Sequence, residues 1–360
     1  MNANGPAGRR ATRPVVVLVS LLVMALAVSI GWLVGTARPD ARPALTSALD
    51  ALPSRTTVVG FTDWARVRDR IGLTEVDTRS ERTTLVTAAS KRDLTTRSLF
   101  RRDVEVMHSE LGWSAADIEW EVFGQDPVGD ESVVRLDDSI SFDGLRDRLD
   151  DAGYARRGSI WRASEGTHRL PAILANVALV PRQRLVVMSD RPQQVPGVLD
   201  VIHGRAPSLA ASHAAADTAR ALAGTDSVIL QAKTLGCDTT AVTRDAEVQQ
   251  QARAAVERVG SLETYRFSGR AIADRGGSGF SAQRLIFAMT FGSATEASEQ
   301  ADVRARLTDG PFIGRTGTMD ETLRLRSAGA DEGTVRLEFA HDPRTDVFMT
   351  GTGPVLFASC

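Results

Sequence analysis

Two acidic residues in one predicted strand could do chemistry together. Residues 118–122 read Ile-Glu-Trp-Glu-Val, and this alternation of apolar and acidic side chains predicts a half-exposed strand. Alternate side chains of a strand share one face, so Glu119 and Glu121 should point in the same direction. A pair of carboxylates could act as a general acid and base, or could bind a cation. A solvated strand face would produce the same pattern without any function.

A carboxylate and an indole follow the first predicted strand of the chain. The β-branched residues 56–61 predict this strand, and Asp63 and Trp64 come soon after it. They could lie in a groove, and together with Glu119 and Glu121 they make up our candidate cleft. The alternative is that Asp63 caps a short helix and that Trp64 anchors this helix by packing.

Familiar catalytic and cofactor motifs are missing from the sequence. It contains neither the HExxH pattern of zinc proteases, nor a GxSxG nucleophile elbow, nor an SxxK pattern. Two distant cysteines cannot supply the clustered ligands of structural zinc. We therefore assign no catalytic residue, no metal ligand and no cofactor. Scattered histidines still allow a catalytic site gathered from distant segments. These histidines are His108, His168, His203, His213 and His341.

The only two cysteines, Cys237 and Cys360, predict a disulfide in an exported chain. An even number of cysteines favours pairing in an oxidising compartment. A bridge that closes such a long loop would contribute roughly 4–5 kcal/mol in the chain-entropy relation. Two unpaired buried thiols are the alternative.

The longest apolar run lies near the amino end. Residues 15–34 carry no charge, and at about 1.5 Å per residue a helix of this length spans a hydrocarbon core of about 30 Å. Arginines precede the run, so residues 1–14 should stay in the cytoplasm while the remainder is exported. We predict a retained transmembrane helix over 15–35 and a linker over 36–50. A cleaved signal peptide is the alternative, since Gly, Thr and Ala at 35–37 offer small residues to a peptidase.

Composition narrows the range of partners. The 360 residues are 42% hydrophobic, which is ordinary for a globular protein. The formal net charge is −2, so bulk electrostatic capture of nucleic acid is not expected. The partners to expect are the membrane, through the single span, and an envelope protein, lipid or polymer.

The predicted order of strands and helices occurs twice. We expect the order strand, helix, strand, strand, helix, strand, strand over residues 51–207 and again over residues 226–360. The Ala-rich stretch 208–225 predicts a helix that connects the two. The sequence thus predicts an α+β fold of two pseudo-repeated halves, each an antiparallel sheet with helices on one face. The Thr-rich residues 73–96 predict an exposed loop. Residues 354–359 predict a final strand.

Most of residues 50–190 and part of the second half resemble uncharacterised single-pass, membrane-anchored envelope proteins of high-GC Gram-positive bacteria. The stretches that carry the resemblance are ALPSRTTVVGFTDWARVRDRIG (51–72), LGWSAADIEWEVFG (111–124) and DDAGYARRGSIWR (150–162). The resemblance implies an envelope protein without an assigned activity, and it carries over no functional residues.

These observations favour a binding or structural role over catalysis. We expect a non-enzymatic module of the cell envelope, with its N-terminus in the cytoplasm and its C-terminal domain outside the cell membrane. The alternative is an envelope hydrolase with a dispersed catalytic site. A cleft holding a nucleophile, a base and a hydrogen-bonded orienting group would favour the hydrolase, and a groove without such a set would favour binding.

Overall fold

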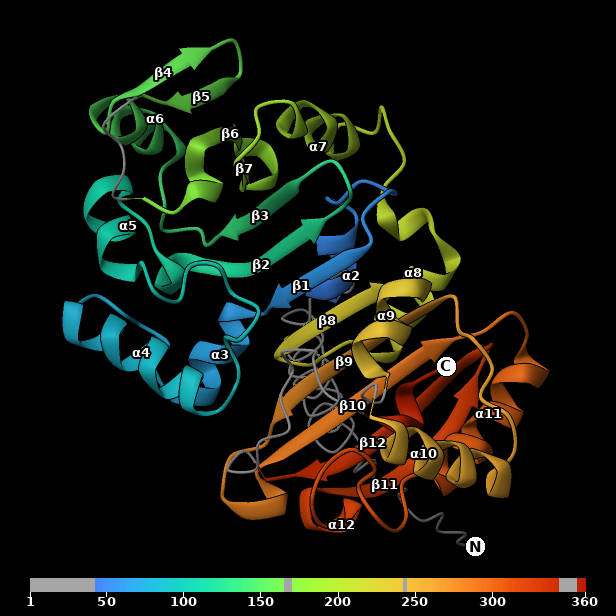
Figure 1. The fold of residues 1–360 in the computed structure, drawn as a ribbon. Helices are drawn as coiled ribbons and strands as arrows, with labels where there is room; N and C mark the ends of the chain where they lie inside the picture. The colour runs from blue at the N-terminus through green and yellow to red at the C-terminus, as the bar shows by residue number, and fades with distance from the viewer. Residues whose placement is uncertain (1–42, 165–169, 242–244, 343–354) are drawn as a thin grey trace, which may run out of the picture. The chain divides into compact units, whose positions relative to one another are not determined.

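One large sheet organises the structure. The computed structural model describes residues 43–164, 170–241, 245–342 and 355–360. Within them, twelve strands form one antiparallel sheet in the order β11-β12-β10-β9-β8-β1-β2-β3-β7-β6-β5-β4 (Figure 1). The strands are β1 (Val58–Thr62), β2 (Ile118–Gln125), β3 (Asp130–Leu136), β4 (Tyr154–Arg157), β5 (Ile160–Ala163), β6 (Asn176–Val180), β7 (Leu185–Ser189), β8 (Ser227–Ala232), β9 (Phe267–Asp274), β10 (Gln283–Thr290), β11 (Leu323–Asp331) and β12 (Thr334–His341).

Both halves of the chain contribute to this sheet, whereas the sequence predicted a separate sheet in each. β1 from the first half pairs with β8 from the second, with Gly60 opposite Ile229. Each of these strands has one other neighbour, β2 for β1 and β9 for β8. Pairing their remaining edges satisfies backbone N–H and C=O groups that two separate sheets would leave open. The prediction of two sheets is therefore wrong, while a mixed α+β fold on antiparallel strands is confirmed.

The strands of the two halves follow the same order outward from the centre of the sheet. Outward from the β1–β8 pair, the sheet continues through β2, β3, β7 and β6 on one side. On the other side it continues through β9, β10, β12 and β11. The first half carries an additional hairpin of β4 and β5 at its outer edge. Apart from this hairpin, the order of strands outward from the β1–β8 pair is the same on both sides.

Helices cover both faces of the sheet, not one as the sequence predicted. Along β10, Leu285, Phe287 and Met289 join one hydrophobic cluster, and Ile286 and Ala288 join a second cluster on the opposite face. The face of the second cluster carries α2 (Ala44–Leu49), α7 (Gln194–Ile202) and α8 (His213–Ala221). The face of the first carries α3 (Trp64–Ile71), α4 (Arg79–Lys91), α5 (Val104–Leu111), α6 (Phe142–Asp151), α9 (Lys233–Thr240), α10 (Ala246–Val259), α11 (Ala294–Arg306) and α12 (Met319–Thr322).

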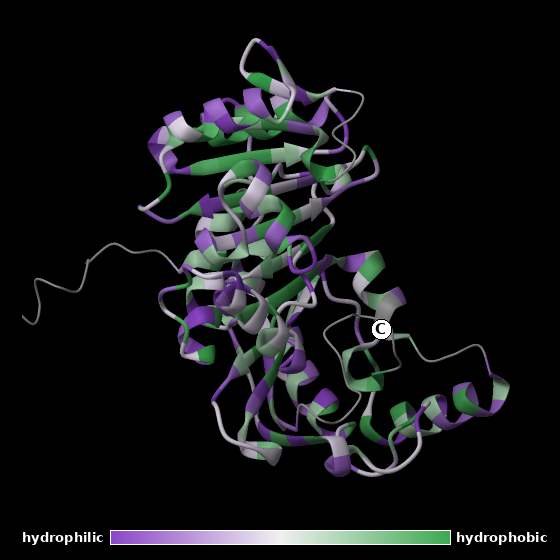
Figure 2. Ribbon diagram, turned by 90° about the vertical axis from the view of Figure 1, so that its left-hand side faces the viewer, coloured by the Kyte–Doolittle hydropathy of each residue, from purple (hydrophilic) through white to green (hydrophobic). Residues whose placement is uncertain are grey.

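Burial on both faces allows an interior strand such as β7 to be apolar along almost its whole length. Every residue of β7 is buried, and residues 185–188 read Leu-Val-Val-Met. Such a continuous run is what a strand covered on both sides requires. Figure 2 shows hydrophobic residues running through the strands, while the helices mix hydrophobic and hydrophilic positions. β6 and β7, which the short turn at residues 181–184 connects, pair as an antiparallel hairpin.

Residues 73–96 contain the helix α4 instead of the predicted exposed loop. The Thr78 side chain accepts a hydrogen bond from the Glu81 N–H, and the Glu81 carboxylate accepts one from the Thr78 N–H at 2.9 Å. This reciprocal arrangement is a capping box, and the Thr-x-x-Glu spacing was its sequence signal. Only three residues of α4 are buried, which is why the helical period is faint in the sequence.

The predicted transmembrane helix over 15–35 and the predicted tail over 1–14 lie outside the described residues. So does the first part of the predicted linker, whose last residues include α2, beginning at Ala44. Among the described residues, no helix combines the length and the apolar character needed to cross a bilayer.

Candidate functional site

The structure brings two residues of the candidate cleft into direct contact. The indole Nε1–H of Trp64, on α3, donates a hydrogen bond to Glu121 Oε2 on β2 at 3.0 Å. The other carboxylate oxygen accepts the backbone N–H of Leu99 at 2.7 Å. Trp64 is 0% exposed and Glu121 is 1% exposed. These side chains therefore lie in the core and do not line an open cleft.

The other two residues of the candidate cleft have separate roles. Asp63 caps α3, since its carboxylate accepts the Arg66 N–H at 3.0 Å. Burial raises the pKa of Asp63 to about 6. Glu119 sits where a β-bulge interrupts the pairing of β2 with β3, and it forms an ion pair with Arg135 at 2.7 Å. The bulge breaks the alternation, so Glu119 is half-exposed while Glu121 is buried.

Glu121 makes stability depend on pH. Burial raises its pKa from about 4.5 to about 7, although hydrogen bonds from Trp64, Ser98 and Leu99 oppose the shift. The folded protein then holds a proton between these values that the unfolded chain has released. The free energy of unfolding should therefore fall as pH rises from about 5 to 8, by roughly 3 kcal/mol from this group.

Substitution of Glu121 tests this dependence. Glu121→Gln should flatten the fall by most of that amount, measured by urea unfolding at pH 5 and pH 8. The matched control is Glu119→Gln, which removes a half-exposed carboxylate two residues away and should keep the wild-type slope. Equal slopes in wild type and Glu121→Gln would show that Glu121 does not hold the extra proton.

The carboxyl-terminal segment is bonded to distant parts of the second half. The predicted disulfide between Cys237 and Cys360 is confirmed, with its Cα atoms 5.4 Å apart. The segment forms a single 3-10 turn, η6 (Leu356–Ala358), and not the predicted strand. The Ala358 carbonyl accepts the hydroxyls of Thr240 at 2.9 Å and Tyr265 at 3.1 Å.

A buried arginine completes this attachment. Arg304, on α11, is 0% exposed. Its guanidinium donates to the carbonyl oxygens of Phe357 and Ser359, each at 2.8 Å, and to that of Glu263 at 2.8 Å. It also lies over the ring of Tyr265, 5.7 Å from the centroid. Burial lowers the pKa of Arg304 to about 10, so it stays charged at neutral pH.

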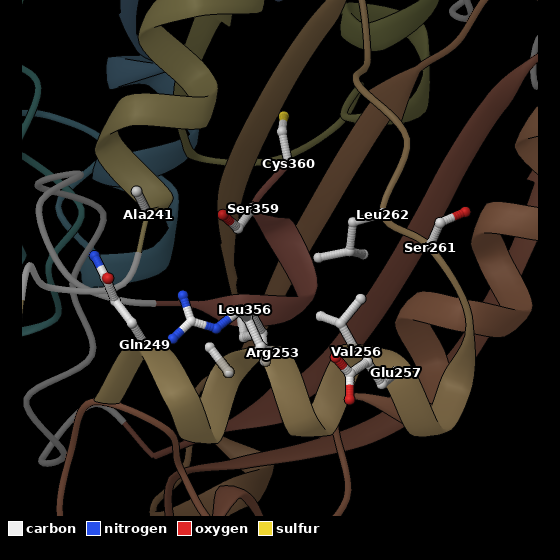
Figure 3. Close-up of a pocket in the computed structure, with 11 residues that line it drawn as sticks. Ala241, Gln249, Arg253, Val256, Glu257, Ser261, Leu262, Leu356, Ser359 and Cys360 are labelled. Atoms are coloured by element: carbon white, nitrogen blue, oxygen red, sulfur yellow. The ribbon is translucent and has the colours of Figure 1, made fainter. Parts of the chain in front are cut away.

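The fixed segment forms one wall of a cavity of about 600 Å³, which we call the α10 cavity. Asp245 caps α10, and its carboxylate accepts the N–H groups of Glu247 and Val248. One face of the helix then points into the cavity at positions 249, 252, 253, 256 and 257, the spacing of a helical stripe. Figure 3 shows Gln249, Arg253, Val256 and Glu257 on this helix, with Ser359 and Cys360 across from them. The lining residues are Ala241, Gln249, Ala252, Arg253, Val256, Glu257, Ser261, Leu262, Leu356, Ser359 and Cys360.

The lining divides into apolar and polar parts. Ala252, Val256, Leu262 and Leu356 supply apolar surface, and Ala252 and Leu356 are largely buried. Charged and amide side chains come from the same helix, at Gln249, Arg253 and Glu257. A cavity of this size with mostly apolar walls and a few polar groups has the form of a small-molecule site. The sulfur of Cys360 is held in the disulfide and is no free nucleophile.

Comparisons with known proteins add little to this geometry. No family model matches the chain, and no curated protein matches it. Among solved structures, crystal form I of TP0453 is similar with a TM-score of 0.40 and 7% identity, covering 87% of this chain and 95% of that one. Crystal form III of TP0453 has a TM-score of 0.37 at 7% identity, covering 87% and 97%. Likenesses of this size carry no argument about function.

Proposed function

We propose that this chain is a membrane-anchored, extracytoplasmic binding protein of the cell envelope, and that the α10 cavity is its binding site. The observation that carries the proposal is the cavity itself, about 600 Å³ between α10 and the disulfide-bonded carboxyl-terminal segment. Its volume falls within the range of roughly 300–1,000 Å³ typical of small-molecule sites.

The ligand that suits this lining is an amphiphile with an apolar body and a polar end. Val256, Leu262 and Leu356 offer apolar surface, whose burial against a ligand contributes about 25 cal/mol per Å². Arg253 and Glu257 lie one helical turn apart on the same wall and can orient a polar or charged end. A cavity walled partly by backbone that a disulfide holds in place needs little rearrangement to accept such a ligand.

Two features support the extracytoplasmic location. The disulfide joins residues 123 positions apart, and such bonds persist in oxidising compartments. The charge-free run 15–34, with arginines before it, favours export of everything that follows. In this proposal, the exported domain holds its ligand site outside the cytoplasm and beside the membrane.

Photo-crosslinking in intact cells tests the site. Full-length protein with benzoylphenylalanine in place of Gln249, which lines the cavity, should trap the ligand for identification by mass spectrometry. The same substitution at Gln250, an exposed neighbour outside the lining, should trap at least tenfold less. Equal yields from the two positions would reject the α10 cavity as the site.

A second pair of variants controls for chance contacts. Val256→Trp should fill the cavity and reduce the yield from position 249 at least tenfold. Ala254→Trp adds the same side chain at an exposed position of α10 and should leave the yield unchanged. An undiminished yield in Val256→Trp would mean that the trapped molecule lies elsewhere.

A further inference from the structure

A second pocket, on the first half of the chain, is lined by cationic side chains. It has a volume of about 510 Å³ and lies beside the carboxyl-terminal half of α4. We call it the α4 pocket. Its lining residues are Val86, Thr87, Ser90, Lys91, Arg101 and Arg102. Three of these six carry a positive charge and none is acidic.

Two chain segments bring the charges together. The capping box starts α4 at Arg79, so positions 86, 87, 90 and 91 fall on one helical face. Arg101 and Arg102 come from the turn before α5, whose first residue is Val104. The pocket therefore depends on the helix that replaced the expected loop.

The cations of the α4 pocket are not neutralised by ion pairs among the described residues. Glu105, in the first turn of α5, is engaged by another arginine, since it pairs with Arg82 at 3.0 Å. Asp103 is the nearest acid in sequence, and burial raises its pKa while the charge of Arg102 opposes the shift.

The remaining electrostatic features do not reverse the sign of the pocket. Lys91 is the last residue of α4, so the helix carbonyl end contributes about half a negative charge there. The carboxylate of Asp103, which attracts Arg102, adds one negative charge, and the three positive charges of the lining still exceed the two contributions together. The pocket has a net attraction for anions at neutral pH.

We infer that the α4 pocket binds a phosphate group, either as free phosphate or as the phosphate of an anionic lipid headgroup. Guanidinium groups of Arg101 and Arg102 offer paired N–H donors that match two phosphate oxygens. Lys91 adds a third charge, and the hydroxyls of Thr87 and Ser90 can donate to the remaining oxygens. This site is separate from the α10 cavity and does not depend on the function proposed for that cavity.

Calorimetric titration of the full chain in a zwitterionic detergent tests the inference. One arm uses inorganic phosphate, and the other uses dihexanoyl phosphatidylglycerol, with dihexanoyl phosphatidylcholine as its zwitterionic reference. We expect saturable binding in at least one anionic arm, weakened by added salt because the contacts are exposed. Binding of phosphate alone assigns the free ion as the source, and binding of the anionic lipid alone assigns the headgroup. Saturation in neither anionic arm would overturn the inference.

Matched pairs of arginine variants locate the binding. Arg101→Gln/Arg102→Gln should weaken binding at least tenfold. Arg156→Gln/Arg157→Gln removes two adjacent exposed arginines from β4 and should change it less than twofold. Lys91→Gln alone should weaken binding about threefold, as expected for one exposed charge. Equal losses in the two arginine pairs would show that net charge, and not the α4 pocket, attracts the anion.

Discussion

Replacing both cysteines with serine, Cys237→Ser/Cys360→Ser, should lower the free energy of unfolding by about 5 kcal/mol. The bridge joins positions 123 apart, and the chain-entropy relation gives about this value for a loop of that length. The loss should also release residues 355–360, which form one wall of the α10 cavity. Urea unfolding of the full chain in detergent would measure the stability, and photo-crosslinking from position 249 would report on the cavity.

Reduction of the wild-type protein provides the matched comparison. Wild type in excess reductant should approach the stability of the double variant, and the variant itself should not respond to reductant. A double variant within about 1 kcal/mol of wild type would contradict the structural role given to the bridge.

Arg304→Met should cost at least about 3 kcal/mol of unfolding free energy. Methionine keeps an unbranched side chain but leaves the carbonyl oxygens of Glu263, Phe357 and Ser359 without their donor. Each unsatisfied buried acceptor costs about 1–3 kcal/mol. Amide hydrogen exchange should show the largest loss of protection in residues 355–360.

The control for Arg304 lies two residues further along the same helix. Arg306 is exposed and donates one hydrogen bond to the Val259 carbonyl at 2.8 Å. Arg306→Met should therefore change stability by no more than about 1 kcal/mol. If the two variants lost the same amount of unfolding free energy, the burial and the three hydrogen bonds of Arg304 would not be the cause of its effect.

Local chemistry in the sequence was enough to predict several of these features. Two cysteines in a chain that we predict to be exported implied the bridge between Cys237 and Cys360. Apolar and charged residues alternate over 323–326 and 335–339, a pattern typical of a hairpin, and the structure pairs β11 with β12 there. In each case the signal involves neighbouring residues or a count of residue types, and tertiary contacts do not alter it.

The pairing of strands in the sheet could not be predicted, because the spacing of residue types along the chain does not show which strands lie side by side. The pairing of β1 with β8 joins residues about 170 positions apart, with Val58 opposite Gln231. Neither strand has a sequence feature that indicates which strand it pairs with. The two-sided cover of the sheet was more accessible, because an unbroken apolar run such as 185–188 already argues against one solvated face.

The candidate sites differ in how clearly the sequence indicates them. The interpretation of Glu119 and Glu121 as a pair failed because one bulge shifts the alternation, and a bulge of this kind has no reliable sequence mark. Arg304 is an arginine in a helix rich in charges, and only the packing of α11 against the carboxyl-terminal segment shows its burial. The capping box at Thr78 and Glu81 was readable, and it would have located α4 and its pocket.

The account depends most on the described domain lying outside the cytoplasm, because the disulfide and the ligand site both assume that compartment. A single engineered thiol, His203→Cys, stands at an exposed position of the full chain. In intact cells, a membrane-impermeant maleimide should label this thiol as completely as it does after lysis. A thiol placed in the predicted tail by Asn4→Cys should react only after lysis. Protection of His203→Cys until the cells are broken would contradict the extracytoplasmic location and the binding function proposed with it.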